Sequence, residues 1–462
     1  MDEAAVGPPQ APGPGPEPGH VLPASSPPAP PASAFSHAWS MSAAVTAGIV
    51  VALICLGMAL AVANVELALV GLPLAIATAL AWDRRPPSRT PSTFTSETRR
   101  SRERTSLDYI VGITAGTAVD AVHVRLRTLG SQERDYIVAP ATAAALRGTI
   151  PVLHSGPQRF VETRYRLIGA DASFLSEPTL PLFAERVVEP PYTAPRSLPL
   201  PERLTGLTGP HNSSRPGDGG EFRDIDRFTS GDRLRRIDWR ATARRAQAPG
   251  ELYVRRTTAT SDAAILIVLD SRDDVTDGVA EWSSGAPRNR GISSLDLARE
   301  GASSLAAGYI RSGDRVGFHD LATQTRALRP GGGARHLYRV LDAIARTRPS
   351  GYASDRVRAP QVVPGAEIIV FSTFLDEEAA HLAVLWRASG HRVIGVDTLP
   401  NPVTTGLIRR ELVAFRIVMM ERDERLHRLR AAGIDVVHWE RSADHPDRES
   451  VLRILSRPRG VR

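Results

Sequence analysis

The stretch "AAILIVLDSRDD", residues 263–274, decides the fold of the C-terminal half of this chain. Seven apolar residues precede Asp270, and such a continuous run is typical of a strand buried on both faces of a parallel sheet. Further strand-like runs alternate with helix-like segments along the chain, at 314–321, 366–373, 391–399 and 434–439. The alternation predicts a doubly wound α/β domain over residues 261–460, with helices on both faces of its sheet.

Upstream of this domain, residues 201–260 contain the densest mixture of charges and aromatic side chains, "GGEFRDIDRFTSGDRLRRIDWRATARR" at 219–245. Arginine and aspartate are suited to bidentate ion pairs, and the aromatic side chains are suited to anchoring the segment. Three interpretations stay open: a clasp between neighbouring domains, a docking surface for a partner protein, or a catalytic site. The candidate residues are Glu221, Phe222, Phe228, Gly231, Asp232, Arg235, Arg236, Asp238, Trp239 and Arg244.

The same segment carries a recognisable signature. An EF pair at 221–222 is followed by an aromatic-x-x-GD turn at 228–232, an R-x-IDW segment at 235–239, and an AR pair at 243–244. Together with "GELYVRR" at 250–256, this pattern resembles the bacterial domain-of-unknown-function family 58. The resemblance extends over about residues 105–460. It implies a von Willebrand factor A-like C-terminal domain, two N-terminal membrane helices and partnership with a MoxR-type AAA+ ATPase in assembly or maturation of membrane or envelope components.

The resemblance also raises the question of a metal, because von Willebrand A domains bind a divalent cation through a D-x-S-x-S strand end. Here Asp270 is present, but Arg272 and Asp274 stand where the two serines would be. A Mg²⁺ site would use Asp270, Asp274 and Asp376, since carboxylate oxygens suit that ion. It would make the chain a Mg²⁺-dependent adhesion module that binds a partner's carboxylate. The alternative is a degenerate site in which Arg272 pairs with a carboxylate in place of the ion.

The N-terminal region is expected to cross a membrane. Residues 1–38 are rich in proline, alanine and glycine, which predicts a disordered tail. Residues 39–82 hold two apolar runs, at 43–63 and 67–82, long enough for a pair of transmembrane helices joined by a tight turn. Seven arginines follow between positions 84 and 104. Because arginine-rich flanks stay in the cytoplasm, the large C-terminal part is expected on the cytoplasmic side of a cell membrane.

Between these parts, the sequence predicts a basic linker at 83–105 and a β-rich, sandwich-like module at 106–200. The stretch "AVHVRLRTL" at 121–129 alternates apolar and polar residues, as a half-buried strand does. The segment "ATAAALRG" at 141–148 is the one place in this module that suggests a helix.

Composition narrows the function. The chain of 462 residues has a net charge of +7 and contains no lysine, which excludes a P-loop phosphate site or a Schiff base. The single cysteine, Cys55, cannot form an internal disulfide. Arginines are interspersed with acids and aromatic content is 5%, so nucleic-acid binding is not expected. We find no nucleophile–base pair. The sequence therefore favours a non-enzymatic interaction protein without a cofactor, of undetermined oligomeric state, over a hydrolase that would use Asp232 or Asp238.

Overall fold

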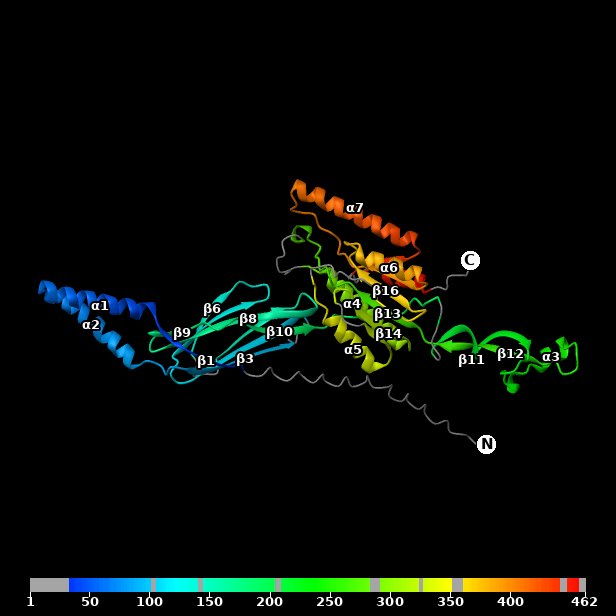
Figure 1. Cartoon of the computed structure of the whole chain (residues 1–462), viewed down its shortest axis with the longest axis horizontal. Coiled ribbons are helices and arrows are strands. Elements are labelled where there is room, and N and C mark those ends of the chain that lie inside the picture. The colour runs from blue at the N-terminus through cyan, green and yellow to red at the C-terminus, as the bar shows by residue number, and fades with distance from the viewer. Residues whose placement is uncertain are drawn as a thin grey trace, which may run out of the picture.

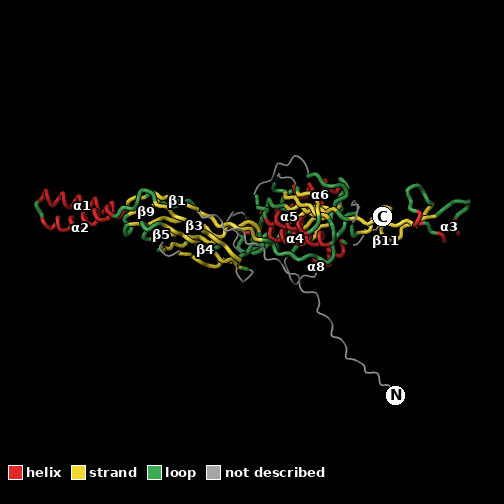
Figure 2. The backbone as a smooth tube through the Cα atoms, turned by 90° about the horizontal axis from the view of Figure 1, so that it is seen from below, coloured by secondary structure: helices red, strands yellow, loops and turns green. Residues whose placement is uncertain are grey.

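The computed structural model is an elongated molecule in which four parts follow one another (Figure 1). In space, from one end of the molecule to the other, these parts are a helical hairpin, a β-sandwich, an α/β domain and a long two-stranded arm that points away from the hairpin (Figure 2). The structure describes residues 33–100, 105–139, 144–202, 204, 209–282, 291–323, 327–350, 360–440 and 447–456.

The hairpin consists of α1 (Ala43–Val62) and α2 (Val65–Asp83). The side chain of Asn64 accepts a hydrogen bond from the amide of Glu66 and so caps α2 directly after the turn. Both helices are long and apolar enough to cross a membrane, and only 11% and 6% of their most apolar windows are buried within the protein. Such exposure does not fit two core helices of a water-soluble domain. It fits helices whose solvent is lipid.

The β-rich region is a sandwich of two antiparallel sheets, as predicted. One sheet has the order β1-β3-β4-β7, and the other has the order β2-β9-β8-β5-β6 with β10 also paired to β8. The strands are β1 (Ser33–His37), β2 (Trp39–Met41), β3 (Thr90–Arg100), β4 (Ser106–Ala115), β5 (Ala121–Thr128), β6 (Arg134–Val138), β7 (Ala144–Pro151), β8 (Gly156–Gly169), β9 (Phe174–Ser176) and β10 (Leu182–Val188).

The two sheets share one hydrophobic core. From β5, Val122, Val124 and Leu126 point inward while the residues between them stay at least partly exposed, which is the alternation expected of a strand with one buried face. They belong to the same core cluster as Leu107 and Val111 of β4, a strand of the other sheet.

Three expectations for this region need correction. The segment 83–105 is not simply a linker, because β3 lies within it and pairs with both β1 and β4. Part of the predicted tail, Ser33–His37, is strand β1, whereas residues 1–32 lie outside the described residues. The helix suggested at 141–148 is wrong, because Ala144–Pro151 is strand β7. In β3 the inward-facing positions include Thr90 and Ser92, which hydrogen-bond inside the sandwich, so the strand lacks the usual apolar pattern.

The C-terminal half is the predicted doubly wound α/β domain. Its sheet has the order β15-β14-β13-β16-β17-β18, in which all neighbours are parallel except the edge strand β15. The strands are β13 (Ala264–Leu269), β14 (Arg315–Asp320), β15 (Leu328–Gly331), β16 (Glu367–Ser372), β17 (Arg392–Asp397) and β18 (Asp435–His438). The helices are α4 (Ser294–Arg311), α5 (Ala334–Ala345), α6 (Glu378–Ala388), α7 (Arg409–Ala431) and α8 (Asp447–Leu455), with a short 3-10 turn η2 (Val279–Glu281).

The central strand β13 contacts a separate core on each side of the sheet. Ile265, Ile267 and Leu269 pack with α4, α5 and α8, whereas Leu266 and Val268 pack with α6 and α7. The unbroken apolar run in the sequence is therefore explained by burial on both faces.

The arm is an antiparallel ribbon of β11 (His211–Arg227) and β12 (Tyr253–Ser261). Its far end, which we call the tip and define as residues 228–252, holds a 3-10 turn η1 (Leu234–Arg236) and the short helix α3 (Trp239–Arg245). The tip lies at the opposite end of the molecule from α1 and α2 (Figures 1 and 2).

Candidate functional site

The carboxyl edge of the sheet, where ligands of doubly wound domains usually bind, is lined with polar side chains. Strands β13, β14, β16, β17 and β18 end at or next to Asp270, Asp320, Ser372, Asp397 and His438. Ser271 donates a hydrogen bond to Asp320 at 2.6 Å, and Ser372 donates one to Asp270 at 2.8 Å. The edge is thus a connected polar network.

A buried arginine occupies the centre of this network. The Nε and Nη2 atoms of Arg272 donate to the two carboxylate oxygens of Asp270, each at 2.8 Å. Its Nη2 also donates to Asp376 at 2.8 Å, and its Nη1 donates to Glu378 at 2.7 Å. Only 2% of Arg272 is exposed to solvent. Burial alone lowers the pKa of the guanidinium, but its three carboxylate partners outweigh burial and raise it, so the charge is permanent.

This arrangement does not fit a metal ion. Arg272 places a positive charge against Asp270 and Asp376, which were two of the three proposed Mg²⁺ ligands. The third, Asp274, accepts a hydrogen bond from the amide of Leu295 at the start of α4. Within the part of the chain that the structure describes, no group of three acidic, histidine or cysteine side chains is arranged to hold a metal. The degenerate alternative, with Arg272 in place of the ion, describes the geometry.

A second arginine fills the neighbouring part of the edge. Arg422 of α7 is 5% exposed, lies 2.5 Å from Asp397 and donates to the carbonyl of Thr373 at 2.8 Å. Burial raises the pKa of Asp397, but His438 and Arg422 outweigh burial and lower it. The hydrogen bond with Asp397 in turn raises the pKa of His438. Two buried guanidinium groups, each neutralised by carboxylates, therefore take up the space where a ligand would enter.

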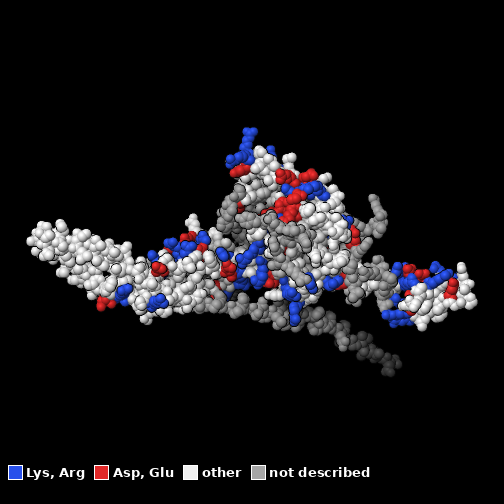
Figure 3. Space-filling model, in the orientation of Figure 1, with Lys and Arg blue, Asp and Glu red and all other residues white. Residues whose placement is uncertain are grey.

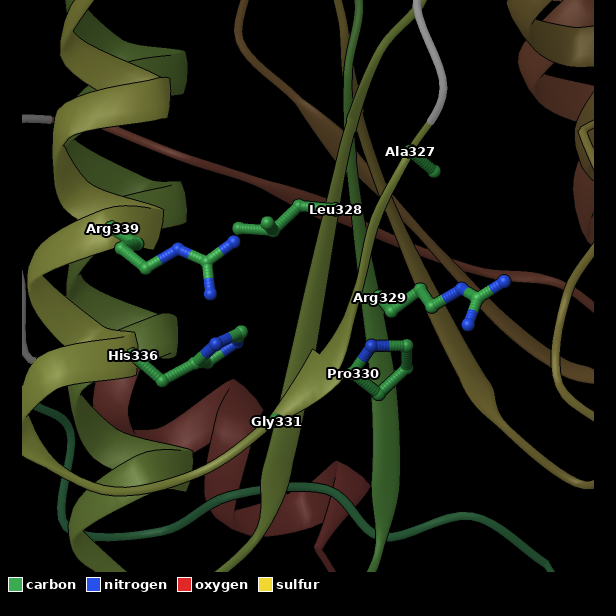
Figure 4. A pocket seen from close by; sticks show the side chains of 7 residues that line it. All are labelled: Ala327, Leu328, Arg329, Pro330, Gly331, His336 and Arg339. Atoms are coloured by element: carbon green, nitrogen blue, oxygen red, sulfur yellow. The ribbon is translucent and has the colours of Figure 1, made fainter.

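An open hollow lies elsewhere on this domain, at the antiparallel edge strand (Figure 4). It has a volume of about 540 Å³ and is lined by residues 327–331 of β15 and its approach, with His336 and Arg339 from α5. The His336 imidazole is held by the carbonyl of Val316 through Nε2 at 2.7 Å. The lining brings together no carboxylate and no nucleophile, and it contains none of the candidate residues.

The junction between the sandwich and the α/β domain is held by a polar cluster that the sequence did not reveal. Asp296 of α4, which is 1% exposed, accepts hydrogen bonds from the amide and hydroxyl of Ser155 at 2.7 Å and contacts Nδ1 of His154 at 2.6 Å. Arg299, one turn later, donates to the carbonyl of Ser155 at 2.7 Å and to that of Thr347 at 2.7 Å. Burial of Asp296 opposes ionisation, but these partners lower its pKa to about 2. These residues form the interdomain clasp.

The segment predicted as a clasp is therefore not at a domain junction. It forms the arm, and the tip stands clear of both domains (Figure 1). The proposed residues are divided between the ribbon and the tip. Glu221 and Phe222 lie on β11, where the Arg255 guanidinium lies 5.3 Å from the centre of the Phe222 ring. The remaining candidates, from Phe228 to Arg244, belong to the tip.

Within the tip, the acidic side chains stabilise the local fold. Asp232 accepts hydrogen bonds from the amide and hydroxyl of Thr229 and from Arg256, and these bonds outweigh partial burial and lower its pKa. Asp238 caps α3 by accepting from the amide of Ala241 at 3.0 Å. Glu251 accepts from the amide of Gln247 at 2.9 Å.

The two carboxylates considered for a hydrolase, Asp232 and Asp238, are thus used as structural acceptors. Asp232 closes the turn in which Gly231 adopts a φ of 108°, a conformation that favours glycine, and Asp238 begins a helix. Neither carboxylate lines the hollow beside β15. The arrangement gives no support to hydrolysis.

By contrast, several apolar and basic side chains of the tip face solvent. Trp239 is 68% exposed and Leu234 is 70% exposed. Arg235, Arg240 and Arg244 are also exposed, and so is Arg245. The tip therefore presents an indole and a leucine side chain among arginines, and charged residues are visible around it in Figure 3.

Part of this chain, beginning inside the arm, matches a known protein family. Residues 224–403 match the family model described as "Protein of unknown function DUF58". The match supports the resemblance to DUF58 that the tip motif suggested, and it covers less than half of the chain. It includes the tip, β13 with Arg272 and the strand ends up to β17, whereas most of β11 and the second buried arginine, Arg422, lie outside the matched residues.

Comparisons with curated proteins and with solved structures do not identify a function for the chain. No curated protein matches the chain. Among solved structures, the chain is similar to one titled "Crystal structure of Br derivative BhCBM56", at 15% identity over 20% of this chain and 91% of that one, with a TM-score of 0.14. A score this low carries no argument about the fold of the sandwich or about its ligands.

Proposed function

We propose that this chain is a membrane-tethered, non-enzymatic interaction protein that reaches its partner through the tip of the arm. The observation that carries the proposal is the placement of the most specific sequence motif. Trp239 and its neighbouring arginines lie exposed at the end of the molecule farthest from the two apolar helices. Exposed tryptophan and arginine are the side chains most often responsible for binding energy at protein interfaces.

Anchoring in a membrane is supported by the way the hairpin joins the sandwich. Strand β1 precedes α1, strand β3 follows α2, and the two strands pair side by side. The two ends of the hairpin must therefore lie on the same side of any membrane that it enters. Hydrogen bonds such as those from Trp39 Nε1 to Thr90 Oγ1 and from the Ser42 amide to the Ser173 carbonyl hold the sandwich close to the hairpin.

The orientation follows from charge. Glu66 is the one charged residue of the turn region, whereas Arg84 and Arg85 lie directly after α2. Since arginine-rich flanks are retained in the cytoplasm, the sandwich, the α/β domain and the arm face the cytoplasm in our proposal. The location would be the inner membrane of a bacterial cell.

The partner is inferred from the family resemblance. A MoxR-type AAA+ ATPase is the expected partner, and assembly or maturation of membrane or envelope components is the expected process. The similarity of the α/β domain to von Willebrand A domains, which often mediate protein contacts, is likewise part of the proposal. Its arginine-filled edge favours a role without Mg²⁺, because Arg272 already neutralises Asp270.

The proposal is tested with the full chain in detergent micelles and a purified MoxR-type ATPase from the same organism. In a tipless variant, an Asn-Gly turn replaces residues 228–252 and joins Arg227 to Tyr253, which already face each other across the ribbon. We expect wild type to bind the ATPase and the tipless variant to lose affinity by about tenfold or more, as when the main anchors of an interface are removed. Equal binding by both proteins would contradict the proposed docking element, and no binding by wild type would contradict the proposed partner.

A control protein carries Arg409→Glu and Arg410→Glu, two exposed positions at the start of α7. This variant should bind like wild type. Carbonate extraction of membranes tests the anchor independently: the full chain should stay with the lipid fraction, and a chain that appears in the wash would contradict the membrane assignment.

A further inference from the structure

The tip carries an excess of positive charge, and its acidic groups are all used internally. Six arginines and three acidic residues lie between positions 228 and 252, which leaves a formal charge of +3. We propose that the tip recognises an acidic protein surface that contains an apolar pocket for the Trp239 indole. This inference rests on the proposed docking role of the arm and specifies the chemistry of the partner.

The first step of the argument concerns the carboxylates. Asp232 is held by Thr229 and Arg256, Asp238 caps α3, and Glu251 accepts from Gln247 and lies 3.3 Å from Arg227. Two of these acids are thus paired with arginines of the ribbon, at positions 227 and 256. This pairing with the ribbon leaves net positive charge on the tip for an external partner.

The second step concerns the arginines that remain. Arg235, Arg240, Arg244 and Arg245 are exposed, and within the described residues no ion pair within 4 Å joins any of these four to a carboxylate. Arg240 and Arg244 stand four residues apart on α3, so they lie on the same face of the helix. Like charges at this spacing destabilise a helix slightly. A carboxylate-bearing partner would relieve that repulsion.

The third step concerns the apolar side chains and their support. Trp239 is the first residue of α3, and the backbone on either side of it is fixed. The amide of Asp238 donates to the carbonyl of Tyr253 at 2.8 Å, and the amide of Tyr253 donates to Thr242 Oγ1 at 2.9 Å. A large exposed indole on a well-supported backbone loses little conformational freedom on binding, which favours a pocket in the partner as its destination.

The position of the tip favours a protein as the anionic partner over a lipid surface or a nucleic acid. The tip and the apolar hairpin lie at opposite ends of the molecule, so the membrane that holds α1 and α2 is out of its reach (Figures 1 and 2). On the ribbon, Asp224 and Asp226 lie beside Arg256, so the positive surface does not continue along the arm as a track for a phosphate backbone. A protein surface can place its carboxylates individually opposite the arginines.

The test uses the full chain in lipid nanodiscs as bait for a displayed random-peptide library, with the tipless variant for counter-selection. We expect tip-dependent peptides to be enriched in aspartate and glutamate and to contain an apolar or aromatic residue. Their affinity should fall by about tenfold or more on Arg240→Glu together with Arg244→Glu, and it should weaken as NaCl rises from about 0.05 to about 0.5 M. Trp239→Ala should weaken the same peptides, whereas the control pair Arg409→Glu and Arg410→Glu should not.

The opposite results are equally clear. Tip-dependent peptides without acidic enrichment, or acidic peptides that bind the Arg240→Glu, Arg244→Glu protein as tightly as wild type, would overturn the inference. Tip-dependent binding of a labelled single-stranded DNA in preference to the selected peptides would also overturn it. If the tipless chain loses the ATPase but the charge-reversed chain keeps it, the docking role stands and this chemical inference fails. Retention of the ATPase by the tipless chain would instead defeat the docking role.

Discussion

The guanidinium of Arg272 lies against the carboxylate of Asp270 with two hydrogen bonds of 2.8 Å, and both residues are buried at the end of the central strand. The positive charge of the Arg272 guanidinium therefore occupies the edge of the sheet at which the sequence suggested a Mg²⁺ site. The pair is part of a larger cluster, since Asp376 and Glu378 bind the same guanidinium.

Replacing Arg272 by methionine should destabilise the α/β domain. Three carboxylates would lose their shared cation, and removing one partner of a buried ion pair typically costs about 3–5 kcal/mol. The thermal midpoint of the full chain in detergent should fall clearly, whereas the exposed control Arg430→Met should change stability by less than about 0.5 kcal/mol. Addition of Mg²⁺ should leave the wild-type midpoint unchanged. A midpoint for Arg272→Met equal to wild type would show that the cluster contributes little.

The interdomain clasp should weaken in acid. The folded-state pKa of Asp296 is about 2, below its ordinary value of 3.8, so its contribution is complete above about pH 4 and is lost as the pH falls through about 2. The difference corresponds to about 2 kcal/mol. Asp296→Asn should remove this contribution at neutral pH and flatten the midpoint-against-pH curve between these values. Asp342→Asn, at an exposed carboxylate bound to Arg346, is the control and should keep the wild-type curve.

The contribution of Glu367 to folding stability should have the opposite pH dependence to that of Asp296. Complete burial raises its pKa to about 7 despite the nearby Arg392, compared with an ordinary value of 4.5. Because the folded state holds the proton more tightly, stability from this group is full below about pH 4.5 and is lost as the pH rises through about 7. Glu367→Gln should therefore stabilise the protein at pH 8 by up to about 3 kcal/mol. A variant that is less stable than wild type at that pH would contradict the assignment, and the exposed Glu424→Gln serves as control.

The packing of the hairpin can be tested with the native cysteine. A Cβ atom at position 71 would lie 3.0 Å from the Cβ of Cys55, whereas a Cβ at Gly57 would have no neighbour within 4 Å. Disulfides span Cβ atoms about 3.5–4.5 Å apart, so a small movement of the helices would suffice. In oxidised membranes Gly71→Cys should protect Cys55 from alkylation, and Gly57→Cys should not. Full alkylation of the Gly71→Cys protein would mean that α1 and α2 do not pack as described.

Regular elements were predictable where one physical signal dominated. Ile265 to Leu269 form an apolar run because both faces of β13 are buried, and Val122 to Leu126 alternate because one face of β5 is buried. Strand β3 was missed for the converse reason: its inward Thr90 and Ser92 bond to Trp39, His37 and Tyr165, so polar residues occupy core positions.

The functional surfaces were harder to predict than the strands. The contact between Ser155 and Asp296 joins residues that lie 141 positions apart, and neither residue belongs to a local motif. Arg272 was visible in the sequence because it broke an expected ligand pattern. The tip motif was recognisable in the sequence as well, but its chemistry left a clasp, a docking surface and a catalytic site open, and the clasp was favoured. Nothing in residues 219–245 indicated that β11 and β12 would carry them away from both domains.

The placement of β1 and β2 ahead of the apolar helices has a consequence for biosynthesis. These strands leave the ribosome before the helices, but the strands with which they pair, β3 and β9, are made only after both helices. Their sheets cannot close until α1 and α2 have emerged and turned back on themselves. Delivery of the hairpin to the bilayer and maturation of the adjoining sandwich are thereby linked in time, so a nascent chain that fails to insert would also leave its first strands unpaired and open to quality-control proteases.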